Sequence, residues 1–249
     1  MFLEFEGLEN VRDLGGLLRA DGARIRPGLL LRTGRLEKAT EGDIRRLADM
    51  GISQVIDFRD PGEVLKAPDK EIPGAAYHNI RVLPPLSETF KPPEDPSYTA
   101  EEVRHDFQQI YRLMAMHTQA HEAFGEFFRL LLKSEGRPVL WHCTQGKDRT
   151  GVAALLLLTA LGIDQETIMT DYLLTNTFTQ RLLDQFAAME NPPFGMDLAR
   201  EVFLVYPQNL RLYRDCVELE YGSLMNYLEL ALNVGPAEIE TLERYYLEW

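Results

Sequence analysis

A cysteine and an arginine lie six positions apart in one short polar segment of this chain. The segment runs from Trp141 to Gly151 and reads WHCTQGKDRTG. Before it, Val139-Leu140 follows Pro138, a residue tolerated at the first position of a strand. After it, an Ala- and Leu-rich run from Val152 to Leu158 is apolar on every side, as in a buried helix. The pattern predicts a strand, a turn and a buried helix in that order.

The predicted turn is suited to binding an anion. The first backbone N–H groups of a helix have no partner within the helix, and the helix dipole places its positive end there. Together these two features attract phosphate-like groups. Cys143 begins the turn and Arg149 ends it, so a thiol and a cation would both lie beside the bound anion.

Cys143 has the surroundings of a nucleophile. A thiol at a helix N-terminus beside Arg and Lys has its pKa lowered from about 8.5 to roughly 3.5–7.5, which makes it a thiolate at neutral pH. Arg149 offers a planar fork of donors that matches two phosphate oxygens. Gly146 permits a tight backbone turn, and Thr150 can place its hydroxyl near the Cys143 sulfur. These are the parts required for phosphoryl transfer to sulfur.

The segment HCTQGKDRTG resembles the phosphate loop of the cysteine-dependent protein tyrosine phosphatases. In its full form it looks like the atypical bacterial tyrosine- and lipid-phosphatase branch, whose loop is of the type HCxxGKDRTG. Other segments resemble further signatures of that branch and together span nearly the whole chain. They are Asn10–Gly16 (NVRDLGG), Leu31–Leu36 (LRTGRL, with Thr33 where Ser is usual), Asp57–Glu63 (DFRDPGE), Asp171–Asn176 (DYLLTN) and Glu220–Ser223 (EYGS).

The resemblance implies roles for the residues of the loop. Cys143 would be the nucleophile, Arg149 the phosphate fork and Asp148 the general acid. Ordinary tyrosine phosphatases carry that acid in a Trp-Pro-Asp context, which this sequence lacks. Lys147 would be a second cation, and in the branch the Gly-Lys pair accompanies acceptance of phosphoinositides. The other expected substrate-binding residues are Thr144, Gln145, Gly146, Thr150 and Gly151, and neither a metal nor an organic cofactor is required.

The two charged residues before Arg149 also have simpler interpretations. Asp148 can merely complement the helix dipole, in which case Asp57, Asp60 or Asp106 would be the acid. Lys147 can be a solvated side chain that adds only a general positive field.

Other candidate residues divide in the same way between chemistry and structure. His142 can orient the loop or be a buried histidine with satisfied hydrogen bonds. Thr150 can help the thiolate leave or cap the helix, and Cys216, in a charged helical stretch, reads as inert. A structural role is at least as good an explanation as substrate contact for the matching residues of the other segments, Asn10, Arg12, Asp13 and Arg59.

Composition limits the partners. With 26 basic and 39 acidic residues the formal charge is −13, which disfavours nucleic acid and broad adhesion to anionic membranes. The longest apolar run, Val152–Leu161, is about half of a membrane span, so stable insertion is not expected. The two cysteines form no CxxC pair, which favours a reduced compartment. We expect a cytoplasmic protein, with export without a recognisable signal and the oligomeric state left open.

The apolar patterns predict strands at 25–31, 52–58 and 75–80, and helices after Thr40 and at 103–116, 121–133 and 165–189. Two or three further helices follow, and the proline-rich stretch 84–96 reads as an exposed loop. Strands alternate with helices early and helices dominate late, which is typical of an α/β fold with a mostly parallel central sheet flanked by helices. We predict one phosphatase domain over residues 1–249, with an additional helical C-terminal part from about 165 to 249. The resemblance implies a helical lid over the site without identifying its helices.

The sequence therefore predicts a cysteine-dependent phosphatase that hydrolyses phosphate monoesters through a cysteinyl-phosphate. The expected substrates are phosphorylated proteins, as phosphotyrosine or phosphoserine and phosphothreonine, and phosphoinositides. Two other functions stay open: a rhodanese-like sulfurtransferase, which also uses a cysteine loop, and a phospho-ligand binding module without turnover.

Overall fold

Five strands form the sheet that carries the loop, in a computed structural model that describes residues 2–84, 95 and 97–249. Their order is β1 (Arg12–Asp13), β3 (Leu30–Thr33), β6 (Val139–His142), β4 (Gln54–Asp57) and β5 (Ala76–Asn79). Only β1 is antiparallel to its neighbour. The central strand β6 pairs on both sides, with Leu140 opposite Leu31 and Val55. The mostly parallel α/β sheet is therefore confirmed.

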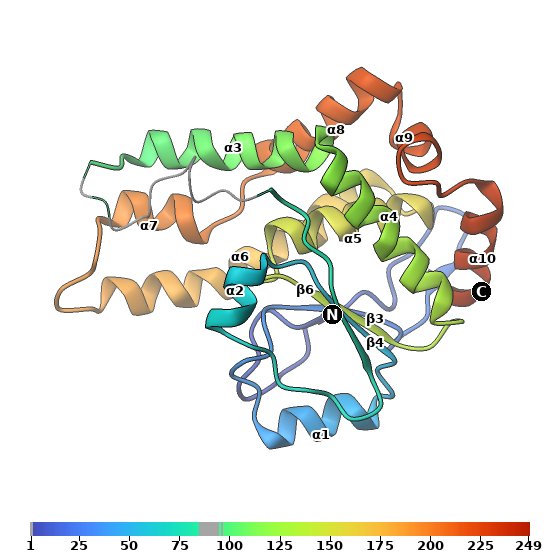
Figure 1. The fold of residues 1–249 in the computed structure, drawn as a ribbon, viewed down its shortest axis with the longest axis horizontal. Helices are drawn as coiled ribbons and strands as arrows, with labels where there is room; N and C mark the ends of the chain where they lie inside the picture. Colours follow the sequence, from blue (N-terminus) through green and yellow to red (C-terminus); the bar gives the residue numbers. More distant parts are fainter. Residues whose placement is uncertain (1, 85–94, 96) are drawn as a thin grey trace.

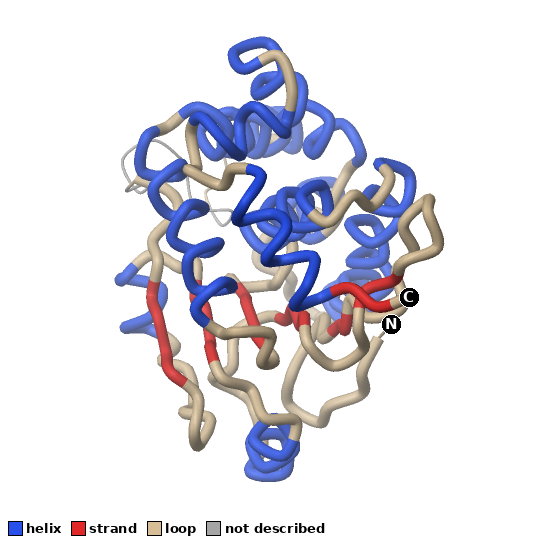
Figure 2. Tube along the Cα trace, turned by 90° about the vertical axis from the view of Figure 1, so that its right-hand side faces the viewer, coloured by secondary structure: helices blue, strands red, loops and turns tan. Residues whose placement is uncertain are grey.

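Helices cover the two faces of this sheet unequally. One face carries α1 (Glu41–Asp49), which Figures 1 and 2 show alone below the strands, while most helices lie above them. A short α2 (Pro61–Lys66) follows β4. The remaining helices are α3 (Ala100–Met116), α4 (Thr118–Lys133), α5 (Asp148–Ala160), α6 (Gln165–Ala187), α7 (Met196–Phe203), α8 (Pro207–Tyr221), α9 (Leu224–Leu230) and α10 (Pro236–Tyr246). A second, two-stranded sheet pairs β2 (Arg24–Ile25) with β7 (Leu247–Glu248).

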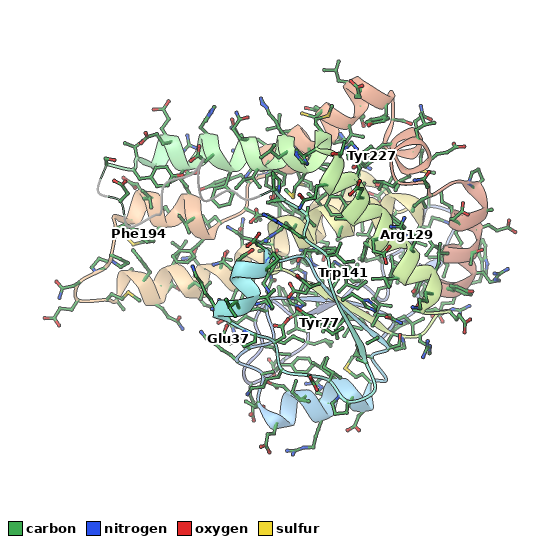
Figure 3. The ribbon with its side chains drawn as sticks, viewed as in Figure 1. Glu37, Tyr77, Arg129, Trp141, Phe194 and Tyr227 are labelled. Carbon is green, nitrogen blue, oxygen red and sulfur yellow. The ribbon has the colours of Figure 1, made fainter. Side chains whose placement is uncertain are left out.

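The alternation of side chains along β6 joins two hydrophobic cores. Leu140 packs into the smaller core between the sheet and α1, whereas Val139 and Trp141 belong to the larger core on the opposite face. The Trp141 ring lies 5.5 Å from that of Phe127 on α4, and its indole N–H donates to the Thr150 carbonyl at 3.3 Å. Figure 3 shows Trp141 near the centre of the molecule. Strand β6 is thus held from both faces just before the loop begins.

A helical extension projects beyond the sheet. In Figure 1 it consists of α3, α7 and the outer part of α6, at the left of the view. Small apolar clusters hold it together, one around Val103 and Leu198 and another around Phe186 and Ala199. The expected helical C-terminal part is present, but α3, which precedes β6 in the chain, packs against it.

The capping signal and most predicted elements are confirmed. Thr40 and Asp43 form a capping box at α1. The predicted continuous strand 25–31 is wrong, because the chain turns at Gly28 (φ 79°) and divides into β2 and β3. Nearly all of the proline-rich stretch 84–96 lies outside the described residues. Within the described part of the chain, no helix is long and apolar enough to cross a bilayer.

Candidate active site

The loop between β6 and α5 turns its carbonyl groups outward. The Thr144 carbonyl accepts from the Arg35 N–H at 3.2 Å, and that of Gln145 accepts from the Asn10 amide at 3.1 Å. The Gly146 carbonyl accepts from the same amide and, at 2.9 Å, from the Arg32 guanidinium. Among the described residues, no acceptor bonds the backbone N–H groups of positions 144–147. The predicted strand–turn–helix is confirmed, and its free donors suit an anion.

Gly146 is required by the close approach of a neighbouring strand. Its φ is 66°, and a Cβ there would lie 2.3 Å from the Thr33 carbonyl oxygen. Only glycine meets both conditions without strain.

Beneath the loop lies a set of buried polar residues that we call the floor network: Asn10, Arg12, Arg32, Asp171 and Thr175. Asp171 accepts from Arg32 at 2.6 Å and from Arg12 at 3.1 Å. Arg12 also donates to the Asn10 side-chain carbonyl and, at 3.2 Å, to the Thr175 hydroxyl. Burial and the charge of Arg32 lower the pKa of Arg12 to about 9. Burial opposes ionisation of Asp171, but the two arginines outweigh it and lower the pKa of this carboxyl.

The floor network explains why three of the sequence segments are present. Asn10 and Arg12 come from the first, Arg32 from the second, and Asp171 and Thr175 from the fourth. Asn10 and Arg32 bond the carbonyls of the loop, and the other three residues hold these two in place. Asn10 has a φ of 58°, a left-handed conformation that asparagine tolerates better than most residues. Their contacts are structural, as the simpler interpretation held for Asn10 and Arg12.

Cys143 lies at the bottom of the loop and is 3% exposed. Burial alone would raise the pKa of its thiol. The charge of Arg149 and the hydroxyl and N–H of Thr150 outweigh burial, and the pKa of Cys143 falls below its ordinary value. The Thr150 side chain is fully buried and its hydroxyl bonds no nitrogen or oxygen of the described residues, which suits a role beside sulfur.

Arg149 forms a bidentate ion pair with Glu63, the last residue of the DFRDPGE segment. The two terminal guanidinium nitrogens donate to the two carboxylate oxygens at 2.6 and 3.0 Å. The Thr144 hydroxyl donates to Glu63 as well. Burial would raise the pKa of Glu63, but the bonds and charge of Arg149 prevail and lower it to about 2. Sequence reasoning missed this residue, although its segment had been singled out.

Three contacts reach the loop from the helical extension, and we call them the roof contacts. The Tyr111 hydroxyl of α3 donates to Asp148 Oδ1 at 2.8 Å. Lys147 Nζ donates to the Val202 carbonyl of α7 and lies 4.7 Å from the centre of the Phe107 ring on α3. Lys147 is 4% exposed, so its interpretation as a solvated side chain is wrong. The helices that contact the loop from above are therefore α3 and α7.

The other candidate carboxylates serve as structural partners in this conformation. Asp57 accepts from Arg59 and from the Tyr77 hydroxyl at 2.7 Å. Asp60 caps α2, and Asp106 accepts from the Tyr98 hydroxyl. Asp148 is the member of this set that belongs to the loop itself.

His142 is a buried histidine with an oxygen atom near each ring nitrogen, and its Nε2 makes no hydrogen bond with the described residues. Nδ1 lies 3.1 Å from the Cys143 carbonyl and Nε2 lies 3.0 Å from Asp69. Burial would lower the pKa of His142, but Asp69 and Asp57 outweigh it and raise the pKa. These two carboxylates and His142 could together hold a cation, yet Arg59 already donates to both at 2.8 and 2.7 Å.

The remaining expected substrate-binding residues lie in the same turn. Gln145 is half-buried, and Gly151 lies in the first turn of α5. A Cβ on Gly151 would meet the Tyr172 ring at 3.0 Å. All loop residues of the predicted site thus lie in one continuous segment that runs from the end of β6 into the first turn of α5.

A family model described as the tyrosine phosphatase family matches residues 3–248. This chain belongs to that family. The expected phosphatase is confirmed, and neither the sulfurtransferase nor the non-catalytic binding module is favoured. A Cupriavidus necator protein, named as a candidate tyrosine-protein phosphatase, is 36% identical over 95% of this chain and 86% of its own length.

A second relative carries a broader name. The triple specificity protein phosphatase PtpB of Mycobacterium tuberculosis is 29% identical over 90% of this chain and 92% of its own length. A solved structure of Pseudomonas aeruginosa TpbA in complex with pTyr aligns over 76% of this phosphatase and 88% of that chain, with 14% identity and a TM-score of 0.29. That superposition is too loose to support any further inference.

Proposed function

We propose that this phosphatase hydrolyses phosphate monoesters in two steps, with Cys143 as the nucleophile. The thiolate attacks phosphorus, an S–P bond forms, and the ester P–O bond breaks as Asp148 gives its proton to the leaving oxygen. Water then attacks phosphorus, its proton passes to the Asp148 carboxylate, and the S–P bond breaks. Arg149 and the loop N–H groups bind the equatorial oxygens throughout.

The observation that carries this proposal is the outward orientation of the loop carbonyls. Donors of the floor network and Arg35 N–H bond the carbonyls of Thr144, Gln145 and Gly146 from outside. The N–H group of each of these peptide units therefore points to the inside of the loop. A buried thiol with a lowered pKa lies at the start of the same loop, where we expect it to meet a bound phosphorus atom.

We propose phosphotyrosine as the first substrate class, because the family match spans almost the entire chain. The name of the Mycobacterium relative supports a wider range of phosphoester substrates. Activity on phosphoinositides would draw on Lys147, which would have to leave the Val202 carbonyl to reach a second phosphate. The span of the family match also supports one phosphatase domain over residues 1–249.

Phosphate release from a substrate panel tests the proposal. The panel holds a phosphotyrosine peptide, a phosphoserine peptide and vesicles containing phosphatidylinositol phosphates. Wild type should release phosphate, fastest from phosphotyrosine, whereas Cys143→Ser should release none and still bind inorganic phosphate. Cys216→Ser is the matched control, since Cys216 lies half-buried on α8, and it should match wild type. Hydrolysis retained by Cys143→Ser would overturn the proposed chemistry.

A further inference from the structure

We propose that Tyr111, supported by Tyr172, is a positioning residue that holds Asp148 in the orientation required for proton donation. The proposal rests on the function proposed above. Tyr111 comes from α3 and Tyr172 from α6, and both side chains are buried, with exposed fractions of 0% and 1%. Their hydroxyl oxygens lie 2.7 Å apart, and Tyr111 is 2.8 Å from Asp148 Oδ1. The three groups form a chain that ends at the loop acid.

The direction of this chain follows from the number of protons. Tyr111 has one hydroxyl proton, and it is donated to the Asp148 oxygen. The bond between the two tyrosines must then be donated by Tyr172. Burial raises the pKa of both hydroxyls well above the ordinary value, so both remain neutral donors. Oδ1 is therefore fixed by a donor. Oδ2 lies 3.7 Å from the Lys147 ammonium and is the oxygen that would carry the proton for the leaving group.

A glycine of the loop lets Tyr172 come close enough to complete the chain. The Cδ2 and Cε2 atoms of its ring lie 3.0 and 3.2 Å from where a Cβ on Gly151 would be. Gly151 lies three residues after Asp148, in the first turn of α5. The ring is thus seated against the same helical turn that carries the acid. This packing fixes the distance between the hydroxyl chain and the carboxyl group.

A purely structural role for the two tyrosines predicts a different outcome from a positioning role. Loss of a buried hydroxyl that only stabilises the fold would slow hydrolysis of all substrates equally, through a smaller folded fraction. Loss of one that orients the acid matters only where the leaving oxygen needs a proton. p-Nitrophenolate leaves readily without one, whereas phenolate, with a conjugate-acid pKa of about 10 like that of tyrosine, does not.

The test measures kcat/KM for Tyr111→Phe and Tyr172→Phe on p-nitrophenyl phosphate and on phenyl phosphate. General acid catalysis contributes roughly 10²–10⁴-fold. We expect Tyr111→Phe to lose about tenfold or more of its kcat/KM on phenyl phosphate and less than about threefold on p-nitrophenyl phosphate. We call this difference between the two substrates the leaving-group split, and we expect a smaller one for Tyr172→Phe. Tyr246→Phe is the matched control, because its buried hydroxyl bonds Ser134 and the Leu131 carbonyl instead, and it should show no split.

Asp148→Ala separates failure of this inference from failure of the proposed function. If Asp148→Ala shows the leaving-group split and Tyr111→Phe does not, the positioning role is wrong and the proposed chemistry stands. If Asp148→Ala itself shows no split, the acid is wrongly assigned and both fall. The double variant should be no worse than Asp148→Ala alone, since Tyr111 acts through that carboxyl group. Should Tyr111→Phe fail to fold, Tyr172→Phe, which keeps the ring against Gly151, decides by the presence or absence of the split.

Discussion

The two sides of the phosphate loop are built from different interactions. Below it, the charged members of the floor network are buried and each bonded more than once, such as Asp171 between Arg12 and Arg32. Above it, each roof contact is one bond or one ring contact, as between Tyr111 and Asp148. The floor bonds backbone carbonyls of the loop, whereas the roof contacts its side chains.

This difference separates the shape of the loop from its chemistry. Buried charges are costly unless fully paired, so the floor network is stable only when complete and holds the loop in one conformation. The roof contacts belong to α3 and α7, in the extension that packs through small apolar clusters of its own. They can be altered singly, and we expect changes there to affect catalysis more than folding.

The largest effect is expected from Asp171→Asn. This change removes the one carboxylate that faces two fully buried guanidinium groups, and the uncompensated charge should cost about 3–5 kcal/mol of stability. Urea denaturation with and without the substitution measures the loss. Thr175→Val is the control, because it removes only one neutral acceptor of Arg12 and should cost far less. A loss below about 1 kcal/mol for Asp171→Asn would show that the floor does not depend on this pairing.

Substitution of Asn10 should have an intermediate effect on stability. Two variants separate the contribution of its side-chain hydrogen bonds from that of its left-handed backbone. Asn10→Gly keeps the left-handed backbone but removes the amide donor of the Gln145 and Gly146 carbonyls and the side-chain acceptor of Arg12. The Gly146 carbonyl keeps its bond from Arg32, and the loss should cost about 1–3 kcal/mol. Asn10→Ala loses the same bonds and adds about 1–2 kcal/mol of backbone strain. Both variants should lose kcat to a similar degree, with Asn10→Ala less stable in thermal denaturation. Full activity in Asn10→Gly would mean that the loop keeps its shape without this amide.

The smallest effect on stability is expected at the roof, from Phe107→Leu. The Lys147 ammonium loses its ring contact, worth about 0.5–2 kcal/mol, and keeps its bond to the Val202 carbonyl and its 3.7 Å contact with Asp148. The less tightly held lysine should change KM for multiply phosphorylated substrates more than for p-nitrophenyl phosphate. Phe128→Leu, in the main core, is the comparison for loss of ring volume alone. An equal change in KM for every substrate would mean that Phe107, like the floor network, supports the shape of the loop and does not act through Lys147.

Prediction from sequence was accurate where neighbouring residues decide the structure. The capping box at Thr40, the strand before Cys143 and the buried helix after it depend on residues a few positions apart. It was wrong at 25–31, where Pro27-Gly28, a dipeptide that marks turns, was overlooked beside the apolar run Leu29–Leu31. It also missed Glu63 and Tyr111 as partners of the loop, since nothing in the spacing of Tyr111 distinguishes it from other buried tyrosines.

The sequence by itself determined which groups we propose to react in this phosphatase. Cys143, Asp148 and Arg149 lie in one turn, and a strand followed by a helix is enough to place them around one anion. Only the tertiary structure decided what holds them, because their partners are separated widely along the chain. Tyr111 lies 37 positions from Asp148, and Arg12 lies 159 positions from Asp171. Contacts over such separations are created by packing of the helices on the sheet, and no local pattern encodes them.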